Sequence, residues 1–141
     1  MTARYLLDTN ICIYIQRQKP PEVLERFKRL KFGDTVISVI TYGELRFGTE
    51  KSKQREQASE MLREFTELVP VVPLPVEAAQ TYGVIRATLE ANGKMIGNND
   101  LWIAAHAKSA GLAVVTNNEN EFSRVPGLKV QNWVLPPRIA R

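Results

Sequence analysis

The stretch RYLLDTNICIYI, residues 4–15, decides the expected fold because a strand pattern runs directly into a helix pattern. Residues 4–7 predict a short strand. Residues 11–15 form an apolar run that fits either a strand or a buried helix, and the preceding residues 8–10, DTN, favour a helix because these residue types cap helix N-termini. A strand that leads at once into a helix indicates a crossover unit and a parallel sheet.

The same alternation continues along the chain and predicts the fold class. Further strands are expected at residues 35–38, 71–74, 113–116 and 129–133. Further helices are expected at residues 21–30, 41–51, 58–68, 78–89 and 101–110. The pattern is typical of an α/β fold in which helices flank a parallel sheet of four to five strands. We expect one domain over residues 1–135, followed by a short basic tail at residues 136–141.

Apolar side chains recur at the spacing of one helix face in the helix expected at residues 58–68. They are Ala58, Met61, Leu62, Phe65 and Leu68. We expect this stripe to face the core.

The composition is that of a folded protein whose polar chemistry must come mainly from carboxylates. Of the 141 residues, 44% are hydrophobic and 24% charged, which excludes a disordered or fibrous chain. The single cysteine, Cys12, and the single histidine, His106, leave no disulfide within the chain and no Cys or His cluster for zinc. One cysteine fits a reducing, cytoplasmic setting, and no stretch reaches the roughly 18 apolar residues of a membrane span. The net charge of +4 favours polyanionic partners.

Four of the 15 acidic residues are expected to meet at one edge of the sheet. Asp8 follows the first strand, Glu44 lies in the first turns of the helix after the second, and Asp100 opens a later helix. Glu121 comes shortly after the last buried strand. Open α/β folds place their sites at this carboxyl edge of a parallel sheet. Because four converging carboxylates repel one another, a cation such as Mg²⁺ or Mn²⁺ is expected there, where it can activate water for attack on a phosphodiester.

A purely structural role stays open for each of these acids. Asp8 can cap the helix that begins after it. Thr41 and Glu44 have the spacing of a capping box. Asp100 can be a first-turn acid stabilised by the helix dipole, and Glu121 can be a solvated surface residue. The structural and catalytic roles are compatible because helix N-termini also lie at the sheet edge.

Four blocks of sequence occur in a characteristic order and spacing. They are YLLDTN at residues 5–10, IS followed by TYGEL at residues 37–45, IGNNDLWIAAHA at residues 96–107, and VTNN followed by EF at residues 115–122. Together these blocks resemble the PIN-domain ribonucleases and, within them, the VapC-type toxins of bacterial toxin–antitoxin pairs. The resemblance covers residues 5–133.

The resemblance implies a PIN fold with an acidic site around Mg²⁺, for which Mn²⁺ can substitute. Asp8, Glu44 and Asp100 would be catalytic, with Asp8 and Asp100 as direct metal ligands and Glu44 acting through water. Many relatives carry an aspartate soon after the strand at residues 113–116, where this chain has asparagines, and Glu121 fits the alternative acidic-Phe form as the fourth acid. The residues expected to support the site are Thr9, Asn10 and Asn118.

The resemblance also implies the activity and the partners. It implies an Mg²⁺-dependent endoribonuclease, the toxin of a type II toxin–antitoxin system, that hydrolyses RNA phosphodiesters. Transfer RNA is the implied substrate class, with initiator tRNA as a candidate. The implied partners are a VapB-type antitoxin, whose C-terminal segment blocks the acidic groove, and a second copy of the chain. The assembly would be a homodimer within a toxin–antitoxin hetero-oligomer.

Two groups of side chains outside the acids are candidates for RNA contact. The segment at residues 17–31 holds six basic and two acidic residues, a net charge of +4, so it can bind RNA phosphates or form a solvated helix face. Its candidate contacts are Arg17, Lys19, Arg26 and Lys28. The rings of Tyr14, Tyr82 and Trp102 can stack on unpaired bases, although aromatic residues at helical spacing more often pack in a core.

Two other function classes fit parts of the sequence. A PIN nuclease can act on DNA or in RNA processing outside a toxin–antitoxin pair. A flavodoxin-like signalling or interaction module is the non-enzymatic alternative. It expects an acidic pair directly after the first strand, where this chain has only Asp8.

Overall fold

The apolar residues after Arg4 form β1 (Tyr5–Leu7), the central strand of a five-stranded sheet. The computed structural model describes residues 2–134. The strand order is β3-β2-β1-β4-β5, and each neighbouring pair is parallel, which confirms the predicted α/β fold and parallel sheet. The other strands are β2 (Thr35–Ser38), β3 (Val71–Val72), β4 (Ala113–Val115) and β5 (Val130–Gln131).

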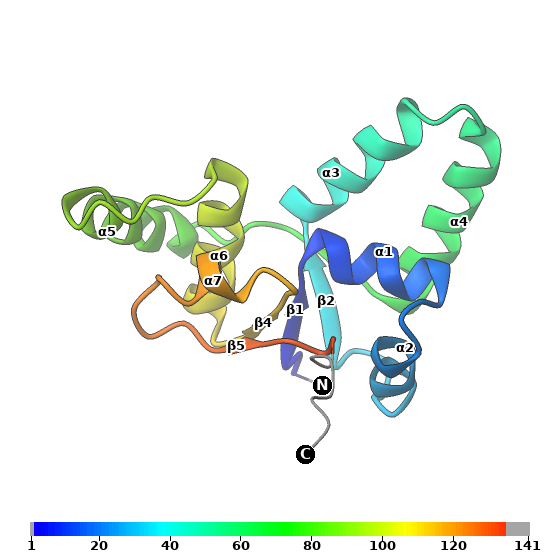
Figure 1. The fold of residues 1–141 in the computed structure, drawn as a ribbon, viewed down its shortest axis with the longest axis horizontal. Coiled ribbons are helices and arrows are strands. Elements are labelled where there is room, and N and C mark those ends of the chain that lie inside the picture. Colours follow the sequence, from blue (N-terminus) through cyan, green and yellow to red (C-terminus); the bar gives the residue numbers. More distant parts are fainter. Residues whose placement is uncertain (1, 135–141) are drawn as a thin grey trace, which may run out of the picture.

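The helices form a layer on each side of this sheet (Figure 1). The helices α1 to α4 lie on one side, and α5 to α7 lie on the other. Their bounds are α1 (Thr9–Arg17), α2 (Pro21–Lys28), α3 (Val39–Glu50), α4 (Arg55–Leu68), α5 (Glu77–Ala91), α6 (Asn98–Ala110) and α7 (Glu119–Phe122). Since both faces of the sheet are covered, its strand ends are the places where polar side chains can gather.

The two faces of the sheet bury separate sets of apolar side chains. Leu6 belongs to the core beneath α5 and α6, where it is joined by Ile85 of α5 and Leu101 of α6. Tyr5 and Leu7 belong to the core beneath α1 to α4. This alternation follows from strand geometry, in which successive side chains point to opposite faces of the sheet.

The helix α3 begins two residues earlier than predicted. Ser38 is its N-cap, and the Ser38 hydroxyl accepts a hydrogen bond from the backbone N–H of Ile40 at 3.1 Å. Thr41 thus lies inside the helix, where it is fully buried, and it is not the N-cap. The capping box between Thr41 and Glu44 that the spacing indicated is therefore wrong. Glu44 lies in the second turn of α3 and does not cap the helix. Its side chain makes its contacts at the edge of the sheet.

The apolar face of α4 is narrower than the sequence pattern indicates. Leu62 and Phe65 are buried, as predicted. Met61 and Leu68 are 44% and 57% exposed, so their predicted place in the core is wrong. Helical spacing shows which side chains share one face, but it does not show how many of them the neighbouring elements bury.

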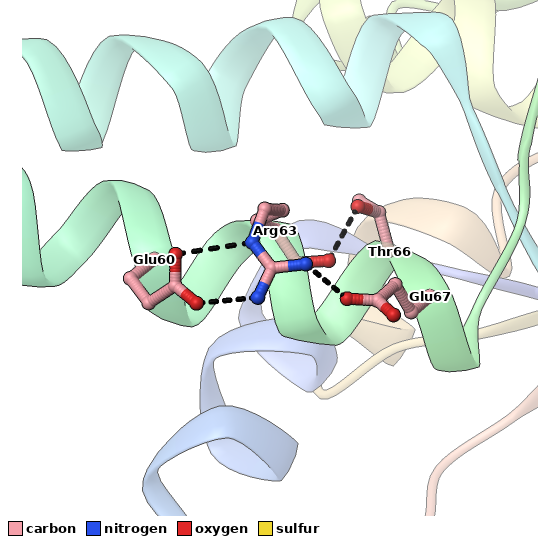
Figure 2. Close-up of polar contacts among 4 residues, drawn as sticks. All are labelled: Glu60, Arg63, Thr66 and Glu67. Atoms are coloured by element: carbon pink, nitrogen blue, oxygen red, sulfur yellow. Dashed lines mark hydrogen bonds and ion pairs between the residues drawn. The ribbon is translucent and has the colours of Figure 1, made fainter.

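The solvent-facing side of α4 is tied by ion pairs along the helix. Figure 2 shows Arg63 between Glu60 and Glu67, which lie three residues before it and four after it. Thr66 also donates a hydrogen bond through its hydroxyl to the carbonyl oxygen of Arg63 at 3.0 Å. Ion pairs at this spacing favour the helical conformation.

Two sequence predictions concern the membrane and the ends of the domain. No helix within residues 2–134 is both long and apolar enough to cross a membrane. The basic tail predicted at residues 136–141 lies outside the described residues. A single domain over residues 1–135 stays a prediction.

Candidate acidic active site

Asp8 lies at the carboxyl end of β1 and caps α1. Its side chain is only 6% exposed. One carboxylate oxygen, Oδ1, accepts a hydrogen bond from the backbone N–H of Thr9 at 2.8 Å, and Oδ2 accepts one from the hydroxyl of Thr116 at 2.8 Å. Burial raises the pKa of Asp8, these two hydrogen bonds oppose the rise, and the charges of Glu44 and Glu121 add to it. Asp8 is therefore a helix cap and a member of an acidic cluster at once.

The register between β1 and β4 places Thr116 beside Asp8. Leu7 pairs with Val115 in the parallel ladder, and the backbone N–H of Asp8 donates to the carbonyl oxygen of Val115 at 2.9 Å. Thr116 is fully buried, and its hydroxyl also accepts a hydrogen bond from the backbone N–H of Asn118 at 2.9 Å. One hydroxyl thus links the end of β1 to the loop before α7.

Glu44 reaches the same edge from α3. Its Oε1 accepts a hydrogen bond from the hydroxyl of Thr9 at 2.6 Å. Its Oε2 accepts one from the side-chain amide of Asn99 at 3.4 Å. Because Thr9 opens α1 and Asn99 lies in the first turn of α6, this carboxylate connects three helices.

Asp100 and Glu121 form a carboxyl pair between α6 and α7. Glu121 lies close enough to Asp100 to influence the pKa of that carboxyl group. Burial is the largest cause that raises the pKa of Asp100 to about 7, and the hydrogen bond with Glu121 is the second. The charges of Asp8 and Glu44 add to the rise. Glu121 is also held by the side-chain amide of Asn118, which donates to Oε2 at 2.8 Å.

The structure thus brings the four acids singled out from the sequence to one place. They come from the end of β1, from α3, from α6 and from α7. Among their supporting residues, Thr9 and Asn118 contact the acids as described above. Asn10 is exposed on α1, and none of the described hydrogen bonds involves its side chain.

The donor set fits a hard divalent cation that retains part of its water. Carboxylate oxygens are the ligands that Mg²⁺ prefers, and a cation would relieve the repulsion that raises the pKa of Asp8 and Asp100. In residues 2–134, no group of three or more His, Cys, Asp or Glu side chains is arranged to hold a metal ion. Mg²⁺ is usually bound through one or two carboxylates and several waters, so a site for this ion does not require three such side chains.

Two grooves lie beside Glu44. One, of about 260 Å³, is lined by Thr9, Glu44 and Arg17 among others. The other, of about 780 Å³, is lined by Thr9, Glu44 and Asn99, with the exposed ring of Phe47 at its side. Arg17 therefore lines the same groove as Glu44, and its contact with RNA stays a prediction.

The other predicted RNA contacts lie elsewhere. Lys19 follows α1, and Arg26 and Lys28 belong to α2, which Figure 1 shows toward the end of the sheet where β1 begins. The guanidinium of Arg26 lies over the ring of Trp133 at 5.5 Å and donates a hydrogen bond to Gln131 at 3.2 Å. These three basic side chains are not brought together with the acidic cluster.

Two polar residues of the site, Thr116 and Asn99, were not singled out as site residues from the sequence. The signal for Thr116 was its position at the end of the strand predicted at residues 113–116; in the structure it follows β4 as Asp8 follows β1. Its contact with Asp8 follows only once β1 and β4 are known to pair with Leu7 opposite Val115. The contact of Asn99 with Glu44 depends on how α3 and α6 pack, for which the sequence carried no signal.

The chain is similar to known proteins over nearly its whole length. Residues 5–128 match the sequence model of the PIN domain. Ribonuclease VapC2 of Haemophilus influenzae is 42% identical over 131 residues, which cover 93% of this chain and 98% of that protein. The tRNA(fMet)-specific endonuclease VapC of Shigella flexneri is 42% identical, with 92% and 98% covered. A crystal structure of DNA-bound VapBC from Salmonella typhimurium matches with a TM-score of 0.88 and 40% identity, with 94% and 100% covered.

Removing the charge of Asp100 should stabilise the fold at alkaline pH. The pKa of Asp100 rises from 3.8 to about 7 on folding, so the folded chain holds this proton while the unfolded chain loses it between these values. The contribution of Asp100 to the free energy of unfolding therefore falls as pH rises from about 4 to about 7. Above pH 7 Asp100 destabilises the fold most. We expect Asp100→Asn to raise the free energy of unfolding by about 1–2 kcal/mol at pH 8, an amount discounted for partial exposure, and by less at pH 5.

The measurement is urea unfolding at both pH values in a chelating buffer. Glu64→Gln, which neutralises an exposed carboxylate on α4, is the matched control and should change little. A loss of stability at pH 8 in Asp100→Asn would contradict the prediction.

Replacing the Thr116 hydroxyl should destabilise the site. Thr116→Val keeps the side-chain shape but leaves the Asp8 carboxylate and the Asn118 N–H each without one hydrogen bond. We expect a cost of about 1–3 kcal/mol in the free energy of unfolding at pH 8. Thr116→Ser keeps the hydroxyl and should cost less, so equal losses in the two variants would show that the hydrogen bonds contribute nothing.

Proposed function

The chain belongs to the VapC ribonucleases of the PIN-domain family, and on this basis we propose that it is an Mg²⁺-dependent endoribonuclease that cleaves tRNA at its acidic cluster. The catalytic residues of this proposal are Asp8, Glu44, Asp100 and Glu121. The observation that carries it is the convergence of these four carboxyl groups, from separate elements, at the carboxyl edge of a parallel sheet.

PIN-domain nucleases generally use divalent metal ions. In this chain Asp8 and Asp100 would hold Mg²⁺, and Mn²⁺ would be accepted in its place because it takes the same oxygen ligands. When bound, the ion supplies charge stabilisation to the phosphodiester and lowers the pKa of water. The raised pKa of Asp100, about 7, means that this ligand is ready to lose its proton near neutral pH.

The chain's own residues orient the nucleophile and manage protons. Glu44 is held on both carboxylate oxygens, by Thr9 and Asn99, and so presents fixed acceptor positions to an attacking water. As the water oxygen bonds to phosphorus, the proton of the water passes to the Glu44 carboxylate, one P–O ester bond of the RNA breaks, and the departing oxygen takes up a proton from the solvent. Glu121, fixed by Asn118, adds a further negative charge beside Asp100 at this site.

The proposed substrate is tRNA, with initiator tRNA as the specific candidate. Two relatives that are 42% and 41% identical over about 130 residues are named tRNA(fMet)-specific endonucleases. A substrate of this kind also favours a cytoplasmic setting. A nuclease that acts on DNA or in RNA processing is the alternative, and a flavodoxin-like module is disfavoured because β1 is followed by one acid, Asp8.

The proposed partner is a VapB-type antitoxin. Solved relatives from Rickettsia felis, Salmonella typhimurium and Haemophilus influenzae, 37–40% identical, are VapBC complexes. The grooves beside Glu44 give an antitoxin segment a place where it would block access to the acids. A homodimer within the toxin–antitoxin complex stays a prediction.

The proposal predicts discrete, metal-dependent cleavage of tRNA. Purified chain, freed of antitoxin, should cut a mixed bacterial tRNA pool in Mg²⁺, and an initiator tRNA transcript should be cut in preference. EDTA should abolish the products, and Asp100→Asn should lower the rate at least a hundredfold, since removing one metal ligand or its charge has effects of this order.

The control is Glu64→Gln, which changes the same amount of charge far from the acids and should cleave at the unaltered rate. Products that persist in EDTA or in folded Asp100→Asn would overturn the assignment of the acidic cluster. Cleavage of DNA but not RNA would favour the alternative nuclease.

A further inference from the structure

A cluster of polar and aromatic side chains joins α5 to α6 next to the acidic site. The rings of Tyr82 and Trp102 stack with their centroids 3.8 Å apart and their planes 14° from parallel. Both residues are only partly buried, unlike Ile85 and Leu101, which form the apolar contact between the same two helices. The stacked pair therefore lies at the surface margin of the α5–α6 interface.

Tyr82 links this stack to both a cation and the start of α6. Its hydroxyl donates a hydrogen bond to Oδ1 of Asn98 at 2.5 Å and accepts one from Nη1 of Arg86 at 2.9 Å. The guanidinium carbon of Arg86 lies 6.0 Å from the centre of the Tyr82 ring. Arg86 is thus held at one nitrogen by a neutral partner while the side chain stays exposed.

The cluster is connected to the acids through the first turn of α6. Asn98, Asn99 and Asp100 are consecutive residues there. Asn98 is bonded to Tyr82, and Asn99 is bonded to Glu44. No side chain caps this end of α6 at its N-cap, Gly97, and these two side-chain hydrogen bonds tie the turn that carries Asp100 to α5 and α3.

Arg86 keeps its positive charge available. The ion pairs among residues 2–134 involve Arg46, Arg55 and Arg63, and none involves Arg86. A guanidinium has five N–H donors, and the structure uses one of them on Tyr82. The remaining donors match the planar, bidentate geometry in which arginine binds a phosphate.

We propose that Arg86, held by Tyr82, binds a backbone phosphate of the RNA substrate that flanks the phosphate cleaved at the acids. This inference rests on the proposed ribonuclease function and adds a specific substrate contact to it. An RNA strand that reaches four carboxylates meets strong repulsion at the neighbouring phosphates, and a cation beside α6 offsets it on that side. The stack on Trp102 fixes Tyr82, and Tyr82 fixes the guanidinium, so little side-chain entropy is lost on binding.

A purely structural role, in which Arg86 only braces Tyr82, does not explain why the arginine is exposed and has no carboxylate partner among the described residues. The interface between α5 and α6 is already closed by buried apolar side chains such as Ile85, Leu89 and Leu101. An exposed arginine that only braced Tyr82 would change stability when removed, but it would not change how RNA binding depends on salt. The salt dependence therefore separates the two roles.

The test measures binding of a labelled initiator tRNA transcript at several salt concentrations. All variants carry Asp100→Asn so that the RNA stays intact. Arg86→Ala should weaken binding about tenfold and reduce the slope of log K against log salt by about 0.7–1, the loss of one phosphate contact. Arg86→Lys should keep the slope, and Tyr82→Phe, which retains the stack but not the hydroxyl, should weaken binding with an unchanged slope.

The matched control is Lys129→Ala, which removes one exposed positive charge just before β5, at the opposite end of the strands from the acids. It should leave both affinity and slope as they were. An unchanged slope in folded Arg86→Ala, checked by its melting temperature, would overturn the inference while leaving the ribonuclease function intact. Failure of the unaltered chain to cleave or bind the transcript, or any tRNA in a mixed pool, would overturn both.

Discussion

The buried carboxylate of Asp8 is the constraint on which the rest of the site depends. A carboxylate that is 6% exposed is tolerated only where the protein supplies hydrogen bonds in place of water. The N–H of Thr9 exists as a donor because α1 begins there, and the Thr116 hydroxyl is in reach because β1 and β4 pair in one register. Burial still raises the pKa of Asp8, so its environment satisfies it only in part.

The incomplete stabilisation of these carboxylates by the protein is also what suits the cluster to bind a cation. The apolar layers on both faces of the sheet supply the stability, while the strand ends collect groups that repel one another. Burial and the neighbouring carboxyl groups raise the pKa of Asp100, and a divalent cation would favour its charged form. A fold that paired each acid with a lysine or arginine would be more stable but would leave no site for a metal ion or a phosphodiester.

The sequence predicted most of the strands and helices because local pattern decides them, although it gave no signal for the short helix α7. The strand at residues 35–38 has the same bounds in the structure. Parallel topology places Asp8 at the carboxyl edge of the sheet, and the packing of α3, α6 and α7 brings the other three acids to it. The start of α3 was missed because Ser38 and Thr41 are both competent caps, and packing, which buries Thr41, decides between them. The contacts of Thr116 and Asn99 depend on strand register and helix packing, which no local pattern contains.

The prediction of RNA-contacting residues from the sequence was limited in the same way, because it too depends on how the elements pack. Charge counted along the chain pointed to residues 17–31, yet of the named candidates only Arg17 lines a groove that also contains one of the acids, Glu44. An isolated arginine such as Arg86 does not stand out in a count of charge along the chain. Its position on α5, hydrogen-bonded to Tyr82, which in turn bonds Asn98, places its cation near the start of α6. What decides substrate binding at an acidic site is the placement of a few unpaired cations around it, because the net charge of the chain is screened beyond about 10 Å.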